Sequence, residues 1–423
     1  MHHLQEGNEM SREWLRIILI LSYILYHAFD WYLDYLDEKH MNAGIPENVR
    51  DVYNEEEYRR WIAYHRERKR LGLTESVVSF AVGLLMLVLN FYAFSFGCFG
   101  KMQVYLQYFC AIFLITTIET IIGIPFKYHS TFVVEEKYGL NKTTGKTFFL
   151  DTLKSWIISA VLEYGLVVII MFLYERFGDP GLVLICIAFI LISLLISLIV
   201  VPLMRVFNKF DPLEEGDLKT DLLSLCTKYG VQVKKIVVRD ASRRTTRANA
   251  FCTGLTKRKT IALDDNLVKE YDNDQIVAVF AHEFAHAKYS HVLKSLPFSI
   301  GQTVLMIAML GVVFHIVPAF EAFGFEGVNY YFALTLLTLF TWPLSRVLEY
   351  VSNRISRKHE YEADGFAAKE GYGEALVSAL KKLSKDSLSN LNPHPLIVEL
   401  EYSHPTLSQR IGSIRKVAPD TAP

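Results

Sequence analysis

The chain alternates between polar loops and apolar runs, and seven of the runs are long enough to cross a bilayer, which takes about twenty mostly apolar residues. These runs cover residues 14–36, 76–99, 102–126, 154–175, 181–205, 295–318 and 330–351. Arg16, His27 and Asp30 interrupt the first run, whereas residues 182–203 of the fifth contain no charged side chain. One soluble domain cannot bury so many apolar helices. The pattern therefore predicts a mainly α fold with a seven-helix transmembrane bundle.

Lys and Arg are distributed unevenly between the loops. The loops 37–75, 127–153 and 206–294 and the C-terminal tail are rich in basic residues, whereas the opposite side carries few. Cytoplasmic loops of membrane proteins carry an excess of Lys and Arg. We therefore expect an integral multi-pass protein with a cytosolic C-terminus and an N-terminus that is outside or lumenal. The first apolar run has no small-residue cleavage site after it, which indicates a retained span.

The apolar pattern also divides the chain into four parts. Residues 1–205 hold spans one to five, 206–294 form the main soluble segment, 295–351 hold spans six and seven, and 352–423 form a C-terminal segment. The soluble segment has helical apolar spacing over 216–229 and again from 274 to 291. Between these helices come three strand-like stretches, 234–240, 250–255 and 259–265, with a turn-like TKRK at 256–259. The segment is predicted to be a small α+β unit.

Composition narrows the possible functions. Apolar residues make up 51% of the chain and charged residues only 21%, below the quarter that is usual in soluble domains. The net charge of −1 gives no indication of a general affinity for nucleic acid. The cysteines are odd in number, scattered and without a CxxC pair, so neither a disulfide framework nor a cysteine metal site is expected. They are Cys98, Cys110, Cys186, Cys226 and Cys252.

Residues 282–286 have the sequence His-Glu-Phe-Ala-His. On a helix, His282 and His286 lie one above the other on a single face, where both imidazoles can bind one metal ion. Glu283 lies about 100° around the helix and can reach a water on that metal as a catalytic base. Taken alone, the pattern also fits an amphipathic helix with two surface histidines.

Glu360 and Asp364 share a helical face in the same way. Catalytic zinc usually takes three protein ligands, which in the thermolysin class (the gluzincins) are two histidines and a glutamate, and leaves a fourth position for water. We therefore predict one Zn²⁺ per chain, held by His282, His286 and Glu360, with Asp364 orienting a ligand histidine. Glu362 points about 200° away from Glu360 and is not expected to be a ligand.

Near the C-terminus, Tyr-Ser-His-Pro at 402–405 is followed by Arg410. His404 and Arg410 could stabilise the oxyanion that forms when water attacks a peptide carbonyl, which makes them candidate catalytic residues. Taken alone, His404 fits a surface position at least as well.

Together these residues resemble the integral-membrane CAAX prenyl proteases of type I, a branch of the zinc metallopeptidases with the HExxH motif. The resemblance covers most of the chain and is specific, because many motifs occur in the same order. The matching segments are VEEKYGLNKTT (134–144), FNKFDPLEEGDL (207–218), SRRTTRANAFCTGL (242–255), HEFAH (282–286), SRKHEYEADGFA (356–367), LNPHPL (391–396) and YSHPTLSQR (402–410).

The resemblance implies seven long helices around a large water-filled chamber, closed at the cytosolic end by the zinc peptidase domain. It implies a zinc metalloendopeptidase that hydrolyses peptide bonds near the C-terminus of prenylated CAAX-type proteins by attack of a zinc-bound water. Asn249 and Asn392 match segments assigned to substrate binding. Asn249 lies on a strand where substrate is thought to pair as an added strand. His404 and Arg410 match positions implicated in substrate and oxyanion binding.

The expected partners are a peptide or protein substrate prenylated at a C-terminal cysteine, and membrane lipid, with no nucleic acid. The expected location is the ER membrane in a eukaryote or the plasma membrane in a bacterium, with the active site on the cytosolic side. A quality-control protease that cuts unlipidated membrane proteins shares the zinc site and remains an alternative. The intact His282, Glu283, His286 and Glu360 argue against a transporter or an inactive scaffold.

The chain departs from the family pattern at a few positions. Phe284 and Ala285 replace a usual Leu-Gly, His359 replaces an aromatic residue before Glu360, and Glu362 replaces a usual Gln. None of these changes removes a ligand or the base. His359 adds a nitrogen that could compete for the metal.

The predicted ligands lie close to spans six and seven in the sequence. His286 precedes the start of span six at about Leu296 by ten residues, and Glu360 follows the end of span seven at Val351 by nine, or roughly 15 Å of helix in each case. We therefore expect both ligand helices to be cytosolic extensions of one transmembrane hairpin. Glu119 and Glu163 fall inside spans three and four, where an ionisable group usually faces a polar cavity. A hydrogen bond between helices is the alternative for these two acids.

Overall fold

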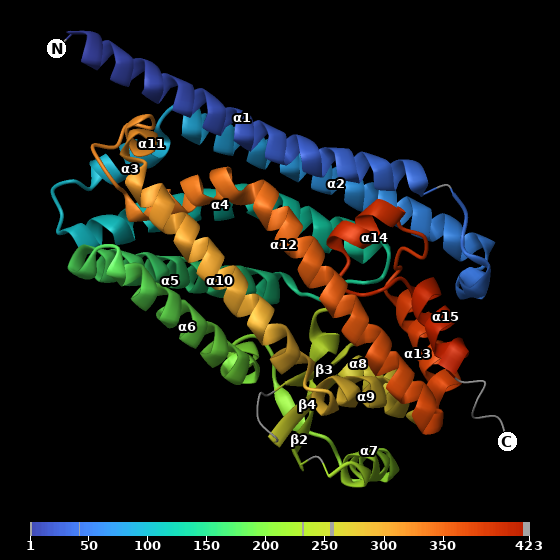
Figure 1. Cartoon of the computed structure of the whole chain (residues 1–423). Helices are drawn as coiled ribbons and strands as arrows, with labels where there is room; N and C mark the ends of the chain where they lie inside the picture. The colour runs from blue at the N-terminus through green and yellow to red at the C-terminus, as the bar shows by residue number, and fades with distance from the viewer. Residues whose placement is uncertain (1, 42, 231, 254–257, 418–423) are drawn as a thin grey trace.

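A computed structural model of the chain describes residues 2–417, apart from 42, 231 and 254–257. Long helices occupy one part of the molecule, and a small sheet with short helices occupies the other (Figure 1). The long helices are α1 (His2–His40), α2 (Glu55–Val88), α4 (Val104–His129), α5 (Gly145–Phe177), α6 (Pro180–Met204), α10 (His291–His315) and α12 (Tyr330–Ala367). The prediction of a mainly α fold is confirmed.

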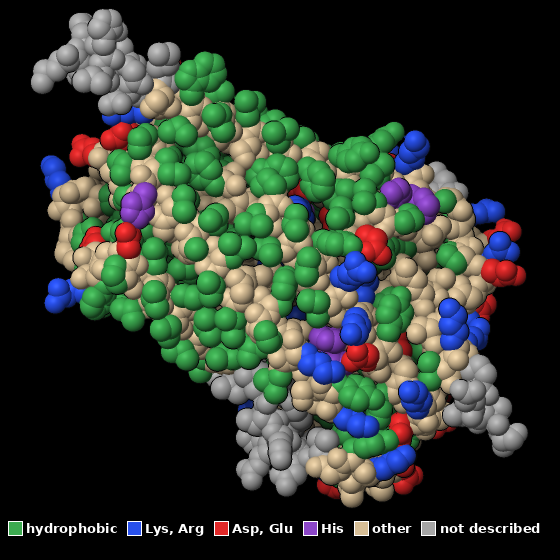
Figure 2. Space-filling view, viewed as in Figure 1, with side chains coloured by type: hydrophobic (Ala, Val, Ile, Leu, Met, Phe, Trp, Pro, Cys, Tyr) green, Lys and Arg blue, Asp and Glu red, His purple; other side chains and the backbone are tan. Residues whose placement is uncertain are grey.

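Six of these helices are long and apolar enough to cross a membrane, counted over the described part of the chain. In that count α6 is a shorter apolar helix, Pro180–Ile196, because the side chains of 197–202 are not described. Figure 2 shows a broad band of hydrophobic side chains between two ends where charged side chains gather. Val183, Leu191 and Leu195 of α6 are more than half exposed, as lipid-facing side chains should be. The chain is an integral membrane protein, and the number of seven spans stays a prediction.

The predicted span 76–99 is not one helix. α2 ends at Val88, and the short helix α3 (Phe91–Cys98) follows after Asn90, whose φ is +53°. Asparagine adopts this left-handed conformation more readily than most other residues. One residue therefore turns the chain inside an apolar run that hydropathy alone reads as continuous.

The predicted loop 37–75 is mostly helical. α2 begins at Glu55, where the side chains of Asn54 and Glu57 each accept a hydrogen bond from the other's backbone N–H. This capping box starts a helix in polar sequence. The helix then continues into the apolar run, so α2 has a polar half outside the predicted span.

The soluble segment contains a four-stranded sheet in the order β1-β2-β4-β3. β2 and β4 are parallel, and each outer strand is antiparallel to its neighbour, so β3 is an edge strand. The predicted strands are confirmed. Residues 254 and 255 of the second predicted strand and 256 and 257 of the predicted turn lie outside the described residues, and Arg258 already belongs to β4. The strands are β1 (Phe210–Pro212), β2 (Gln232–Arg239), β3 (Ala250–Thr253) and β4 (Arg258–Asp264).

Short helices surround this sheet and form the C-terminal part of the molecule (Figure 1). These α-helices are α7 (Asp217–Lys228), α8 (Asp265–Glu270), α9 (Asn273–Lys288), α13 (Gly373–Asp386), α14 (Pro395–Glu401) and α15 (Leu407–Val417). A further short helix, α11 (Val317–Glu321), lies beside α3 at the other end of the molecule (Figure 1). Single turns of other helix types are η1 (Glu47–Val52), η2 (Ser130–Glu135), η3 (Ala241–Arg243) and η4 (Ala368–Tyr372). The helices predicted over 216–229 and from 274 correspond to α7 and α9.

The apolar interior has two parts. One lies in the soluble part, where α9 contributes the fully buried Phe280 and Phe284. The other lies among the membrane helices and includes Ile112, Val167 and Phe332. The soluble part therefore has a core of its own, and that core fixes α9 on its apolar side. The predicted division at residues 205, 294 and 351 stays a prediction.

The two ligand helices relate differently to the membrane hairpin. α12 runs without a break from Tyr330 to Ala367, past the end of predicted span seven, so its predicted extension is confirmed. The extension predicted ahead of span six is wrong, because α9 ends at Lys288 and α10 starts at His291. Ser290 between them has φ of +55°. This left-handed residue breaks the helix and sets α9 at an angle to α10.

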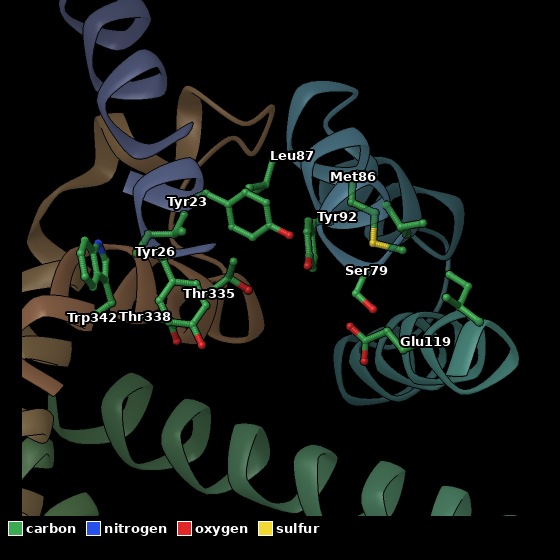
Figure 3. A pocket seen from close by; sticks show the side chains of 14 residues that line it. Tyr23, Tyr26, Ser79, Met86, Leu87, Tyr92, Glu119, Thr335, Thr338 and Trp342 are labelled. Atoms are coloured by element: carbon green, nitrogen blue, oxygen red, sulfur yellow. The ribbon is translucent and has the colours of Figure 1, made fainter. Parts of the chain in front are cut away.

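A cavity of about 450 Å³ lies between α1, α2, α3, α4 and α12. Figure 3 shows the carboxylate of Glu119 beside Ser79 on one wall, with Tyr26 and Thr338 across the space from them. Glu119 thus faces a cavity, as expected for an acid inside a span. The larger chamber implied by the family resemblance stays a prediction.

Candidate active site

α9 carries the His-Glu-Phe-Ala-His sequence. The helix begins with a capping box in which Asp272 and Gln275 satisfy each other's backbone N–H. Phe280 and Phe284 are buried in the core on one face of α9. His282 and His286 lie on another face, where they can contact α12. The packing of α9 against α12 brings Glu360 to these histidines.

His282, His286 and Glu360 form a compact cluster. The Nε2 atoms of the two histidines are 3.2 Å apart. Glu360 Oε2 lies 3.5 Å from His282 Nε2, and Glu360 Oε1 lies 3.3 Å from His286 Nε2. Ligand atoms from the three residues lie within 4.8 Å of one another, the only such group of three or more among the described residues. The structure therefore brings together the three residues that were predicted as metal ligands.

The chemistry of this cluster fits a zinc ion. Two imidazole nitrogens and one carboxylate form a known catalytic zinc set, which leaves a position for water. His282 and Glu360 are 6% and 4% exposed, so the donor atoms are shielded from solvent. Glu360 Oε2 is buried, and the nearest groups to it are imidazole nitrogens, His404 Nδ1 at 2.9 Å and His282 Nε2 at 3.5 Å. A buried carboxylate is costly unless positive charge compensates it, and a cation at the cluster would supply that charge.

Asp364 lies one turn beyond Glu360 on α12 and contacts His282 through the ring nitrogen that does not face the cluster. Its Oδ1 is 2.9 Å from His282 Nδ1, and its side chain is fully buried. Because Nδ1 is engaged by the carboxylate, Nε2 is the nitrogen that faces the cluster. Arg410 donates to both oxygens of Asp364, from Nε at 2.9 Å and from Nη2 at 2.6 Å. The structure thus places Asp364 where a partner of a ligand histidine is expected.

The surroundings shift the pKa values of the groups on α9 and α15. Burial and the charge of Arg410 lower the pKa of His282, but hydrogen bonds to Asp364 and Glu360 outweigh both and raise it to about 9. Burial raises the pKa of Glu283 above its ordinary value, and the two histidines oppose this only in part. Burial also lowers the pKa of Arg410, but Asp364 and Glu360 raise it above its ordinary value. Arg410 therefore remains a cation.

Glu283 lies near these charged groups but forms no hydrogen bond with any of them. Its pKa responds to His282, His286, Glu360 and Arg410, so its carboxylate is close to the cluster. Among the described residues, none forms a hydrogen bond with its side chain. A carboxylate in this position, with a raised pKa, is suited to accept and release a proton.

His404 and Arg410 reach the cluster from the C-terminal segment. His404 Nδ1 lies 2.9 Å from Glu360 Oε2, while most of its ring stays exposed. Arg410 lies on α15, and its Nη1 is 3.8 Å from the same oxygen. Both therefore border the metal position, although Arg410 is already paired with Asp364. Their predicted part in oxyanion stabilisation stays a prediction.

Asn249 directly precedes the edge strand β3, which packs against α9. Its backbone carbonyl accepts a hydrogen bond from Asp264 N at 2.9 Å. The stretch before it is tied to the rest of the molecule by two ion pairs, from Arg244 to Asp151 and from Arg247 to Glu135. The free side of β3 is thus held next to the helix that carries the histidines.

Asn392 lies elsewhere, on the loop before α14. Its side-chain amide donates to the backbone carbonyl of Gly44 at 2.6 Å, and its backbone N–H donates to Asn390 Oδ1. These contacts join two loops and involve none of the cluster residues. Its predicted role in substrate binding stays a prediction.

Sequence reasoning missed His291 as a partner of the site. Its Nδ1 lies 2.9 Å from His286 Nδ1, and its Nε2 lies 3.1 Å from Glu362 Oε2. His359 stacks on His291, with ring centroids 4.2 Å apart and planes 4° from parallel. His359, which was considered as a competing ligand, is therefore not part of the three-residue cluster. A histidine five residues after the second motif histidine was the available signal, but it lies beyond the end of the motif helix.

A second cavity, of about 470 Å³, opens beside the cluster between α6, α10 and α12. His286 and Glu360 form part of its wall. Its other lining residues are mostly small or polar and include Ser193, Ser295, Ser299 and Ser356. Because α6 and α10 are apolar helices, this cavity connects the metal position with the membrane part of the protein.

Comparisons with known proteins match nearly the whole chain. Residues 34–209 match the family described as CAAX prenyl protease N-terminal, five membrane helices, and residues 212–418 match peptidase family M48. The second match contains every residue of the cluster.

Three curated relatives and one solved structure are similar along most of their length. CAAX prenyl protease 1 of Saccharomyces cerevisiae is 29% identical, covering 96% of both chains. The probable CAAX prenyl protease 1 of Schizosaccharomyces pombe is 31% identical, covering 92% of this chain and 86% of its own. An Arabidopsis thaliana homolog is 35% identical over 71% of each chain. The crystal structure of S. mikatae Ste24p aligns with a TM-score of 0.89 at 28% identity, covering 95% of this chain and 99% of that one.

Proposed function

Because this chain belongs to the CAAX prenyl protease family and is a membrane zinc metalloprotease acting on CAAX proteins, we propose that His282, His286 and Glu360 hold its zinc ion. The observation that carries this assignment is the cluster itself, in which two imidazoles and one buried carboxylate converge. The hydrogen bond from His282 to Asp364 supports it, because ligand histidines usually have such a partner.

Zinc, when bound, supplies a Lewis acid that polarises the scissile carbonyl and makes water more acidic. The protein's own residues supply the proton transfers and the geometry. Glu283, which is not held by a hydrogen bond, takes a proton from the attacking water and later delivers it to the leaving amine. Asp364 holds His282 with Nε2 facing the cluster. His404 and the guanidinium of Arg410 border the position where the oxyanion develops, and they stabilise it as donors.

The substrate pairs along the free side of β3. An edge strand offers unpaired backbone groups to an extended peptide, and β3 packs against the helix of His282 and Glu283. Asn249 stands at the beginning of that strand and contacts the peptide near the scissile bond. Asn392 contacts the substrate further away, through the loop it joins to Gly44.

The substrate is prenylated at a C-terminal cysteine, and its lipid stays within the membrane part. A single prenyl chain keeps a peptide at the membrane interface, and the 470 Å³ cavity between α6, α10 and α12 leads from that part to the cluster. The active site and the C-terminus lie on the cytosolic side, in the ER membrane of a eukaryote or the plasma membrane of a bacterium.

The experiment that tests this function compares two peptides on the purified protein in lipid vesicles. One is a farnesylated CAAX peptide, and the other is the same peptide without the lipid. We expect release of the last three residues from the farnesylated peptide alone, and no release by Glu283→Gln, which should keep its metal. Equal rates on both peptides would support the alternative, a quality-control protease of unlipidated proteins. Full activity of Glu283→Gln would contradict the assignment of the base.

A further inference from the structure

His291 and Glu362 continue the hydrogen bonds of the site beyond His286. His286 is placed with Nε2 in the cluster and Nδ1 on the opposite side of its ring, 2.9 Å from His291 Nδ1. On the far side of His291, Nε2 lies 3.1 Å from a carboxylate oxygen of Glu362. His286, His291 and Glu362 therefore form a continuous chain of contacts that starts at the metal position.

The direction of each hydrogen bond follows from the ligand role of His286. A neutral imidazole that offers Nε2 to a metal carries its proton on Nδ1, so His286 Nδ1 donates. His291 Nδ1 must then accept, and its single proton lies on Nε2. That proton is directed at Glu362, which as a carboxylate can only accept. Each of the three side chains thus donates or accepts in a way that is consistent with its neighbours.

The packing around His291 holds its ring in this position. His291 is 3% exposed, and the ring of His359 lies flat against it at 4.2 Å. Ser290, just before it, has φ of +55°, a conformation that costs a non-glycine residue free energy. This left-handed turn starts α10 immediately after α9 and brings His291 back to His286. Lys294, 3.4 Å from Glu362 Oε2, helps to hold that carboxylate in place.

We propose that His291 is a positioning residue of the metal centre, which fixes the ring orientation and proton position of His286, and that Glu362 fixes His291 in turn. Asp364 does the same for His282 through its carboxylate. The two ligand histidines thus receive different support, one from a buried carboxylate directly and the other through a second imidazole. The proposal rests on the zinc ligands proposed above, and it assigns roles to two residues that are not ligands.

Metal affinity of the purified protein, measured by competition with a chromogenic chelator, tests the proposal without reference to turnover. We expect His291→Ala to weaken zinc binding by about 10- to 100-fold, as is typical when a ligand histidine loses its partner. His291→Asn keeps an acceptor oxygen near the position of Nδ1 and should recover most of that loss. Glu362→Ala, one step further out, should weaken binding by less than about tenfold.

Two further variants distinguish a wrong ligand assignment from a wrong positioning role. His315→Ala changes a histidine at the other end of α10 and should leave zinc affinity unchanged, which controls for loss of a histidine from this helix. His286→Ala should abolish zinc binding, and if it does not, the ligand assignment itself is wrong. If His286→Ala loses zinc while His291→Ala binds it like the wild type, the ligands stand and the positioning role is refuted. Equal losses in His291→Ala and His291→Asn would also refute it, because the hydrogen bond would then not carry the effect.

Discussion

The pair of Asp364 and Arg410 gives the sharpest prediction about the site. Asp364→Ala removes three contacts at once: to His282 Nδ1, to Arg410 Nε and to Arg410 Nη2. It also leaves the guanidinium, whose side chain is only 13% exposed, without its main partner. That cation would then lie 3.3 Å from His282 Nδ1 and 3.8 Å from Glu360 Oε2. An unpaired positive charge would thus remain beside a site that has to bind a cation.

Two magnitudes follow from this geometry. Removing one partner of a buried ion pair costs about 3–5 kcal/mol of stability. Loss of the hydrogen bond to a ligand histidine weakens metal affinity about 10- to 100-fold, which equals roughly 1.4–2.8 kcal/mol. Adding Arg410→Ala to Asp364→Ala removes the unpaired charge. The double variant should therefore be more stable than Asp364→Ala alone, with a coupling of more than about 1 kcal/mol.

The three variants are unfolded in detergent with excess chelator, because removal of the metal isolates the stability of the metal-free protein. Zinc affinity is then measured separately. Glu374→Ala is a matched control, because Glu374 pairs with Arg415 of the same helix α15 at 3.1 Å but both side chains are well exposed. Such a surface pair should contribute less than about 1 kcal/mol. If the losses from Asp364→Ala and Arg410→Ala simply add in the double variant, the two residues do not act as a pair and this reasoning fails.

Four other predictions address the ligand, the substrate, the core and the topology. Glu360→Ala should abolish activity and nearly all zinc binding, and zinc retained at wild-type level by elemental analysis would exclude it as the third ligand. Asn249→Ala should lower turnover with zinc content unchanged, and a normal rate on every peptide tested would remove Asn249 from the site. Phe284→Ala should lower stability by about 3–5 kcal/mol, because the ring is fully buried, and a change below about 1 kcal/mol in chemical unfolding would show that the core around α9 is loosely packed. When protease is added to one side of the membrane, it should digest the tag at one terminus and spare the tag at the other, because seven spans place the termini on opposite sides. The same result for both tags would mean an even number of spans.

The sequence was sufficient to predict which side chains come together at the centre of the site. His282, His286, Glu360 and Asp364 were predicted from helical spacing and from what zinc requires, and these rules do not depend on tertiary detail. The same is true of the strands and of α12, whose pattern of apolar residues is strong. Spacing along one helix, however, says nothing about a residue on the next helix.

Two of the features that were missed depend on local turns. His291 reaches His286 only because Ser290 adopts a left-handed conformation. Asn90 breaks the second predicted span in the same way. Neither turn contains a glycine or a proline to mark it, and hydropathy averages over such single residues. The long polar half of α2 was missed because apolar content, which locates a span, does not locate the start of its helix.

The continuity of α12 fixes a distance inside the protein. Trp342 lines the cavity of Figure 3 and Glu360 belongs to the cluster, so eighteen residues of one helix separate them, or about 27 Å. A three-residue product is at most about 10 Å long when extended. If a tripeptide is cut at the cluster, as proposed, it therefore cannot touch both places at once. The length of α12 thus separates the proposed point of cleavage from the inner cavity.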